Sequence, residues 1–347
     1  MRRKIAIAGL GAAARAIHLP AYKKLAGLEV VGGFDPVARQ ADFSFPLFAS
    51  VSEMLEKTTP HILAVVTPTP THFDLAKAGL LAGCHVFCEK PFMTSLAEAD
   101  EIISLSQRVK RWVAVNNEFR FMNAHAAAKR MIGGPDFGEL LFIAMHQTFY
   151  VTEETEAGWR GADMQRTCKD FGPHVFDLCR YFFGEEPRAI TARMPKGRHP
   201  QGPDYLNLIQ LEFSGDRVAH IVLDRLSRGR HRYLDIRLDG SLGTIETSLG
   251  GRIALSAGLS GRRPFAHADI SLGGRARLYQ GEKFRKIAAD PLDLFPHATA
   301  RLLQAFLNAL DEDRPPPCHG ADNRKTLALM LAAYESSARN EPIALDL

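Results

Sequence analysis

The sequence predicts an α/β protein in which a doubly wound parallel sheet is followed by a second α/β domain. Strands and helices alternate through the first third of the chain, which is typical of a parallel sheet. Beyond about Arg120 the rhythm changes, and several alternating strands between 187 and 255 predict a predominantly antiparallel open sheet with helices on one face. A chain of 347 residues is also long for a single core. We therefore expect domains at residues 1–121 and 122–347.

The first strand leads directly into a glycine turn. Ile5 and Ile7 predict a buried strand, and the pattern Gly9-x-Gly11-x-x-Ala14 follows before the start of a helix. In this context the first glycine permits a tight turn and the second lets the backbone approach a pyrophosphate at the helix N-terminus. The candidate cofactor-binding residues of this turn are Gly9, Gly11, Ala13 and Ala14.

The second strand ends in an acidic residue at about the distance expected for a dinucleotide site. Residues 28–34 form this strand, and Asp35 ends it. A carboxylate there accepts hydrogen bonds from ribose hydroxyls and repels a 2′-phosphate, so NAD is favoured as the cofactor. Arg39 keeps NADP possible because it could reach a 2′-phosphate. Asp35 can equally be a turn residue before Pro36, and the two roles are compatible.

Two further strands end in polar loops at the edge where open α/β sheets bind ligands. The strand at 61–66 ends in a Thr- and Pro-rich loop, and the strand at 84–88 ends in Glu89 and Lys90. The first loop can instead be a rigid turn that caps the following helix. Capping boxes at Ser50 and Ser95 predict helices that run to about residues 57 and 110. The candidate cofactor-binding residues of these loops are Thr67, Pro68, Thr69, His72, Glu89 and Lys90.

In the second half of the chain we expect helices at 124–132 and 170–183 and a long strand at 138–150. Gly184 stands where a helix-terminating glycine belongs. The stretch 258–281 is rich in Gly and Arg and predicts an irregular loop. Two amphipathic helices are expected at the end of the chain, at 298–310 and 323–337.

Composition excludes several classes of protein. A net charge of +4 gives no reason to expect nucleic-acid binding, and no apolar run is long enough to span a bilayer. Five scattered cysteines, an odd number, fit reduced thiols in a cytoplasmic protein. Cys84 and Cys88 lack the further ligands that a metal site needs, so no metal is expected.

Three residues could carry chemistry beside a nicotinamide. Lys90 is held between a buried strand and a proline, while Asp170 and His174 stand four apart at the start of a helix and therefore share one face. Gly172 between them would allow close approach of a ligand. A neutral imidazole is a suitable general base near pH 7, and an ammonium stabilises a developing alkoxide. Alone, the Asp and His would be an ordinary helix N-terminus; together with Lys90 and a nucleotide site, they favour catalysis.

Several motifs in this order resemble the Gfo/Idh/MocA family along nearly the whole chain. They are Gly9-x-Gly11-x-x-Ala14, His18-x-Pro20, Thr67-Pro68 with His72, Glu89-Lys90-Pro91, Trp159-Arg160, Asp170-x-Gly172-x-His174-x-x-Asp177 and Asp239-Gly-Ser-Leu-Gly243-Thr.

The resemblance implies a Rossmann domain, a C-terminal α/β domain, and homo-oligomers (dimer or tetramer) formed through the open sheet. It also implies a catalytic set of Lys90, Asp170 and His174. His174 would take the proton of a substrate hydroxyl as hydride leaves its carbon, and Lys90 would bind the reacting oxygen. Asp170 would orient substrate or His174. The Lys90–Pro91 bond would be cis, as is frequent in the family.

Two stretches depart from the family pattern, and both would border the substrate. Residues 164–169 replace a glycine-rich run, and residues 116–121 replace a Gly-Phe-Asn-Arg-Arg-Phe stretch. The candidate substrate-binding residues are Asn117, Arg120, Trp159, Arg160 and Lys169. Arg160, Arg166 and Lys169 could bind an anionic group or be solvated loop charges.

Four further arginines cluster at a predicted hairpin, namely Arg225, Arg228, Arg230 and Arg232. They lack the interleaved aromatic residues of a nucleic-acid site, and a solvated turn or an oligomer contact is expected.

These observations favour an NAD(P)-dependent oxidoreductase that acts on a secondary alcohol of a sugar, polyol or cyclitol. Two alternatives stay open at this stage. One is a glycosidase that uses NAD for transient oxidation, as some relatives in the family do. The other is a non-catalytic nucleotide sensor, which the presence of Lys90, Asp170 and His174 argues against.

Overall fold

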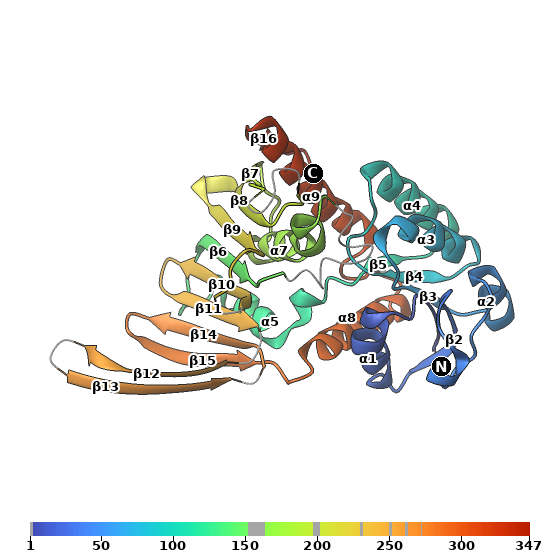
Figure 1. Cartoon of the computed structure of the whole chain (residues 1–347), viewed down its shortest axis with the longest axis horizontal. Coiled ribbons are helices and arrows are strands. Elements are labelled where there is room, and N and C mark those ends of the chain that lie inside the picture. The colour runs from blue at the N-terminus through green and yellow to red at the C-terminus, as the bar shows by residue number, and fades with distance from the viewer. Residues whose placement is uncertain are drawn as a thin grey trace. The chain divides into compact units, whose positions relative to one another are not determined.

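The computed structural model describes residues 3–151, 164–196, 202–229, 232–249, 252–260, 263–271 and 273–347 (Figure 1). The chain divides into two compact units, residues 1–121 with 295–331 and residues 122–294 with 332–347. The expected boundary after Phe121 coincides with a unit boundary. Residues 295–331, which the sequence assigned to the second domain, instead belong to the first unit.

A five-stranded parallel sheet forms the centre of the first unit, as predicted. Its strands, in the order β2-β1-β3-β4-β5, are β1 (Arg3–Ala8), β2 (Leu28–Phe34), β3 (Ile62–Val65), β4 (His85–Cys88) and β5 (Val113–Val115). All four residues of β3 are fully buried, as expected for a strand covered on both faces. The order reverses between β1 and β3, and ligands bind at the carboxyl ends of the strands beside such a reversal.

Helices cover both faces of this sheet (Figure 1). They are the π-helical turn η1 (Ala14–His18), α1 (Leu19–Lys23), α2 (Val51–Thr58), α3 (His72–Leu81), α4 (Leu96–Val109), most of α8 (Leu294–Asp311) and the first part of α9 (Gly320–Arg339). The amides of Glu53 and Glu98 donate to the hydroxyls of Ser50 and Ser95, which confirms both predicted capping boxes.

Helix α8 belongs to the first unit because its apolar face packs into the core of the parallel sheet. Leu302, Leu303 and Phe306 are fully buried in one cluster with Ile5 and Ile7 of β1. The amphipathic period of the helix was visible in the sequence, but the sheet that it would cover was not. The sequence therefore predicted that α8 belongs to the second domain, whereas it packs on the parallel sheet of the first unit.

The second unit is built on a nine-stranded, mostly antiparallel sheet, which confirms the predicted class. The order is β15-β14-β11-β10-β6-β9-β8-β7-β16, and β6 with β9 form a parallel pair. The strands are β6 (Leu140–Thr148), β7 (Ala189–Arg193), β8 (Leu206–Glu212), β9 (Val218–Asp224), β10 (Arg232–Gly240), β11 (Thr244–Leu249), β14 (Arg275–Gln280), β15 (Lys283–Ala289) and β16 (Ile343–Ala344).

The predicted irregular loop at 258–281 was wrong. The strands β12 (Arg252–Ser260) and β13 (Arg263–Ser271) form an antiparallel hairpin, and β14 begins soon after it. Backbone pairing runs from Arg252 opposite Ser271 to Ser260 opposite Arg263. A ladder of backbone hydrogen bonds does not need apolar side chains, so a composition rich in Gly and Arg was a poor guide here.

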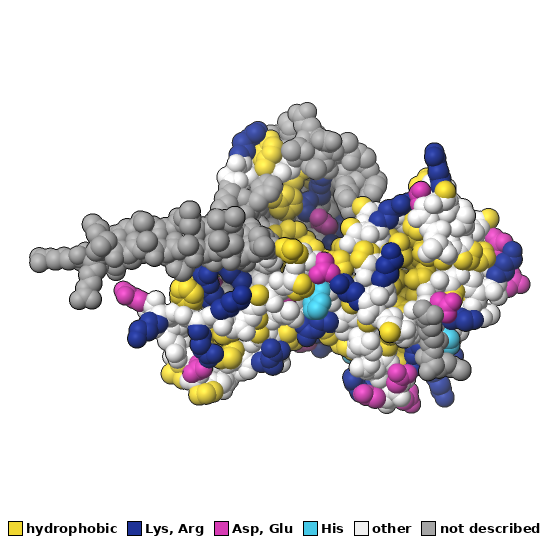
Figure 2. Space-filling model, turned by 90° about the horizontal axis from the view of Figure 1, so that it is seen from below, with side chains coloured by type: hydrophobic (Ala, Val, Ile, Leu, Met, Phe, Trp, Pro, Cys, Tyr) yellow, Lys and Arg dark blue, Asp and Glu magenta, His cyan; other side chains and the backbone are white. Residues whose placement is uncertain are grey.

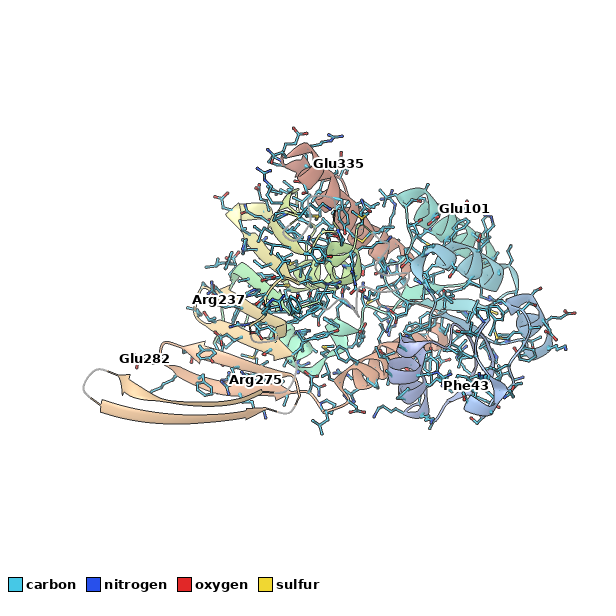
Figure 3. The ribbon with its side chains drawn as sticks, viewed as in Figure 1. Phe43, Glu101, Arg237, Arg275, Glu282 and Glu335 are labelled. Atoms are coloured by element: carbon cyan, nitrogen blue, oxygen red, sulfur yellow. The ribbon has the colours of Figure 1, made fainter. Side chains whose placement is uncertain are left out.

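Two helices, α5 (Asn123–Met131) and α7 (Thr167–Phe183), pack on one face of the large sheet. Along β9 and β11 buried and exposed residues alternate, which places apolar side chains beneath these helices. The opposite face carries charged residues, among them Arg237 (Figure 3). In the view of Figure 2, Lys and Arg side chains are interspersed with Asp and Glu. None of the described helices combines the length and apolar character that crossing a membrane requires.

Candidate active site

The glycine turn after β1 is shaped to receive a phosphate group. Gly9 has φ +91°, and a Cβ there would lie 2.3 Å from the Val66 carbonyl oxygen, so a side chain cannot be accommodated. At Gly11 a Cβ would meet no atom within 4 Å. The turn therefore leaves open space over the backbone at the start of a helix, where amide groups attract an anion. The residues present fit a bound pyrophosphate.

Asp35 is fixed by backbone amides at the carboxyl end of β2. Its Oδ2 accepts from the amide of Leu10 at 2.8 Å, and its Oδ1 accepts from the amide of Val37 at 3.0 Å. The first bond ties Asp35 to the glycine turn, and the second makes it a turn residue as well. Each carboxylate oxygen has a second lone pair and can accept a further hydrogen bond. Binding of a ribose hydroxyl by Asp35 stays a prediction. Arg39 follows four residues later and is exposed to solvent.

The loop after β3 is braced by His72 rather than presenting that side chain outward. The ring is fully buried; its Nε2 lies 2.9 Å from the Thr67 carbonyl and its Nδ1 lies 3.0 Å from the Pro91 carbonyl. Burial lowers the pKa of His72, although these carbonyl contacts act in the opposite direction. His72 thus joins the loops that follow β3 and β4. The cofactor-binding roles of Thr67, Pro68, Thr69 and His72 stay predictions.

Glu89 is the centre of a buried polar network. His18 Nε2 donates to Glu89 Oε1 at 2.6 Å, Asn116 Nδ2 donates to the same oxygen at 2.8 Å, and the Tyr22 hydroxyl contacts His18 Nδ1 at 2.9 Å. Burial alone raises the pKa of Glu89. The hydrogen bond and electrostatic interaction with His18, the positive charge of Lys90 and the Asn116 bond outweigh burial and hold the pKa of Glu89 below its usual range. An ionised carboxylate therefore stands immediately before Lys90.

Lys90 follows β4 directly, as predicted, and the Lys90–Pro91 peptide bond is cis, as the family resemblance implied. Its amide donates to Glu89 Oε2 at 3.2 Å. The lysine therefore belongs to the carboxyl edge of the parallel sheet. This is the edge that carries the glycine turn.

The two candidate substrate-binding residues of the first unit make contacts with the start of α9. Asn117 is buried and donates from Nδ2 to the side-chain oxygen of Asn323 at 2.5 Å. Arg120 forms an ion pair with Asp322 at 3.1 Å. These contacts hold the segment after β5 in place, and a substrate-binding role for either residue stays a prediction.

Helix α7 carries Asp170 and His174 one turn apart, although it begins earlier than predicted, at Thr167. Asp170 keeps 47% of its side chain exposed, whereas His174 is buried and its ring packs edge-on against Phe171. Gly172 was expected to admit a ligand. Instead, a Cβ there would lie 3.0 Å from Cys168 Sγ and from the Phe176 ring, so the glycine serves packing on its own helix.

The N-terminus of α7 is capped by a residue from a distant segment. Asp204 is buried just before β8, and its carboxylate accepts from the backbone amides of Arg166, Thr167 and Cys168. Further donors are Asn207 Nδ2 at 3.0 Å and the Tyr334 hydroxyl at 3.2 Å. Three orphan amides of the helix are thereby satisfied by one negative charge.

Arg225 belongs to this region, a position that its sequence context did not predict. It was expected in a solvated turn or an oligomer contact, but it is buried (4% exposed), and its Nη2 donates to Asp170 Oδ2 at 2.6 Å. Arg228 and Arg232 do lie at exposed positions, and Arg230 falls outside the described residues. The local signal that sets Arg225 apart is its place one residue beyond β9, in step with the buried Leu223.

The remaining candidate substrate-binding or anion-binding residues are Trp159, Arg160, Arg166 and Lys169. Trp159 and Arg160 lie outside the described residues. Lys169 is partly buried, and its backbone amide donates to the Tyr334 hydroxyl at 3.0 Å. Arg166 is buried, so for this residue the solvated-loop alternative was wrong. Within the described parts of the chain, no group of three or more His, Cys, Asp or Glu residues is arranged to hold a metal ion.

Two family models match most of the chain. A model described as "Oxidoreductase family, NAD-binding Rossmann fold" matches residues 3–117, and a Gfo/Idh/MocA C-terminal domain model matches residues 125–246. The fold and these matches together define a two-domain, NAD-binding oxidoreductase. The chain belongs to the Gfo/Idh/MocA family.

Two curated relatives are named as sugar dehydrogenases. A D-apiose dehydrogenase from Paraburkholderia graminis is 24% identical over 99% of this chain and 90% of that protein. A glucose-6-phosphate 3-dehydrogenase from Bacillus subtilis is 28% identical over 55% of this chain and 57% of that protein.

Solved structures share the fold along nearly the entire chain. The myo-inositol 2-dehydrogenase of Lactobacillus plantarum gives a TM-score of 0.79 at 18% identity, with all of both chains covered. An Agrobacterium radiobacter oxidoreductase, solved with NAD+, L-tartaric acid and magnesium, gives 0.82 at 18% identity over 99% of this chain and 98% of that one. At this identity the likeness establishes the fold alone.

Proposed function

We propose that this enzyme is an NAD-dependent dehydrogenase that acts on a secondary alcohol of a sugar, polyol or cyclitol. The observation that carries the proposal is the arrangement on α7. Asp170 and His174 stand one turn apart on a helix whose N-terminus is fixed by Asp204. In a chain of this family, a half-exposed carboxylate beside a buried imidazole suits an alcohol as substrate.

Each residue of the proposed catalytic set has its own part in the chemistry. NAD, when bound, supplies the hydride acceptor. The glycine turn and Asp35 would hold it through backbone amides and a carboxylate. His174 would accept the hydroxyl proton as the carbon–hydrogen bond breaks. Lys90 would hydrogen-bond the same oxygen and stabilise its developing negative charge.

A small polyhydroxylated substrate is supported by the polar character of the candidate residues and by the names of the relatives. Asp170 accepts hydrogen bonds, as sugar hydroxyls require. The two dehydrogenases described above are named for D-apiose and for glucose 6-phosphate. We include Asn117, Arg120, Trp159, Arg160 and Lys169 in the proposed substrate site.

The test is the formation of reduced nicotinamide by the purified protein with NAD, then NADP, against polyols, aldoses, sugar acids and cyclitols. We expect turnover that is lost in His174→Ala, while NAD affinity measured by calorimetry is retained. Binding of NAD without turnover on any alcohol would refute the dehydrogenase and leave an internal-redox glycosidase or a sensor. Failure to bind either nucleotide would refute the cofactor assignment.

We also infer a homo-oligomer, a dimer or tetramer, in a reducing cytoplasm. The charged face of the large sheet is available for self-association, and the five cysteines are all free and buried. Light scattering at several protein concentrations tests the first inference. A monomer at every concentration would contradict it.

A further inference from the structure

The ion pair between Arg225 and Asp170 lies on the covered face of the large sheet. Asp224 ends β9 opposite Thr148 of β6 in parallel register, and Phe149 donates its amide to the Asp224 carbonyl. Side chains alternate along a strand, so Arg225 points to the face on which Leu223 is buried, the face that α7 covers. The register of β6 and β9 therefore directs Arg225 toward the catalytic helix.

Arg225 is held in this place by more than its ion pair. Its amide donates to the Tyr205 carbonyl at 2.8 Å, and its guanidinium carbon lies 5.0 Å from the centre of the Phe149 ring. Only 5% of the arginine side chain is exposed, against 47% for Asp170. The cation is thus packed and desolvated, while the carboxylate that it binds still reaches solvent.

This asymmetry has a chemical consequence. A guanidinium buried without an anion is costly, so the arginine requires Asp170 to be ionised. It also fixes one carboxylate oxygen, Oδ2, and with it the rotation of the carboxylate plane. An ionised, oriented carboxylate accepts hydrogen bonds from substrate hydroxyls, whereas a protonated or freely rotating one would do so poorly.

We propose that Arg225 is a positioning residue of the active site, which keeps Asp170 charged and aligned for hydrogen bonding to a substrate hydroxyl. The inference rests on the proposed dehydrogenase function. It assigns Asp170 a partner from the end of β9, so the carboxylate is oriented by the large sheet as well as by its own helix.

The test is a double-variant cycle on the NAD-loaded protein, with Arg225→Met, Asp170→Asn and the combination. We expect Arg225→Met to lower kcat/KM roughly ten- to hundredfold, the effect of losing one charge-assisted hydrogen bond. In the Asp170→Asn background the same change should add at most about twofold, because the carboxylate that Arg225 serves is already absent. Arg225→Lys, which keeps the charge, should recover part of the activity.

Arg228→Met is the matched control, because Arg228 is exposed and its guanidinium stacks on Tyr150 at 4.1 Å. It should stay within about twofold of the parent, as surface substitutions usually do. Multiplying losses in the combined variant, or no loss in Arg225→Met, would overturn the proposal. Should Arg225→Met not fold, the comparison of Arg225→Lys in the two Asp170 backgrounds decides. An inactive parent protein would refute the dehydrogenase function instead, and NAD affinity distinguishes the two failures.

Discussion

The carboxyl edge of the parallel sheet and the first turns of α7 position polar groups in different ways. At the sheet edge the motif side chains bind one another and the backbone: His72 joins two loops, and His18 holds Glu89. On α7 the motif residues are supported from outside the motif. Asp204 caps the helix, and Arg225 binds Asp170 from 55 positions further along the chain.

This difference explains why the sequence motifs include the supporting residues of the sheet edge but not those of α7. Parallel strands end at a common edge, so residues that follow consecutive strands meet there and can support each other. A helix lying on an antiparallel sheet depends on whichever strand ends pass beneath it. Those strand ends are set by the sheet's order, which the sequence does not display.

The largest expected effect comes from Gly9→Ala at the sheet edge. The new Cβ would lie 2.3 Å from the Val66 carbonyl oxygen, at a φ of +91° that alanine rarely adopts. We expect a loss of stability of at least about 3 kcal/mol and no measurable NAD binding, since backbone and strand end must both move. Thermal unfolding and calorimetry measure these quantities. A variant with parental stability and affinity would show that this edge is not rigid.

A smaller effect is expected when the support of α7 is weakened by Asp204→Asn. The amide retains one acceptor oxygen but loses the charge that faces three backbone amides, so about 2 kcal/mol of stability should be lost. The value of kcat should fall with it, because Asp170 and His174 follow on the same helix. Glu212→Gln on the exposed side of β8 is the matched control and should change neither quantity. Equal behaviour of the two variants would contradict the role given to Asp204.

The sequence was sufficient for the fold class because the two parts have different hydrophobic periods. Continuous apolar runs such as residues 62–65 predicted a parallel sheet, and alternating strands predicted an antiparallel one. It was not sufficient for partners that only the tertiary structure supplies. Arg225 looked like one of several loop arginines, and nothing local marked Asp204 as a helix cap. The hairpin of β12 and β13 was missed because backbone pairing leaves little trace in composition.

Acidification should lower the stability of the first unit through His85. Burial, together with the charges of Arg111 and Arg3, lowers the pKa of His85 to about 4, and its Nδ1 accepts the Trp112 amide at 3.0 Å. The folded first unit therefore binds this proton less readily than the unfolded chain does. The stabilising contribution of neutral His85 is complete above the ordinary histidine pKa of about 6.5 and is lost as pH falls from there to about 4.

Between pH 7 and pH 5 this one group should lower the free energy of unfolding by about 2 kcal/mol. Thermal unfolding across that range measures the slope. His85→Gln should flatten it, since the side chain no longer gains a proton on unfolding. An unchanged slope in the variant would assign the pH dependence to other groups.

The smallest effect is expected for Gly11→Ala. This variant distinguishes the role of Gly11 from that of Gly9 in the same turn. A Cβ at Gly11 meets no atom within 4 Å, so the folded protein accommodates it and thermal stability should match the parent. The added methyl occupies space over the backbone where a pyrophosphate approaches, so NAD affinity should fall by about tenfold, or 1.4 kcal/mol. Calorimetry with NAD, and with adenosine monophosphate as a ligand lacking the pyrophosphate, measures this loss. If the affinities for both ligands fall equally, the methyl group acts on the fold of the turn and not on the pyrophosphate. If only the affinity for NAD falls, the pyrophosphate occupies the open space above Gly11.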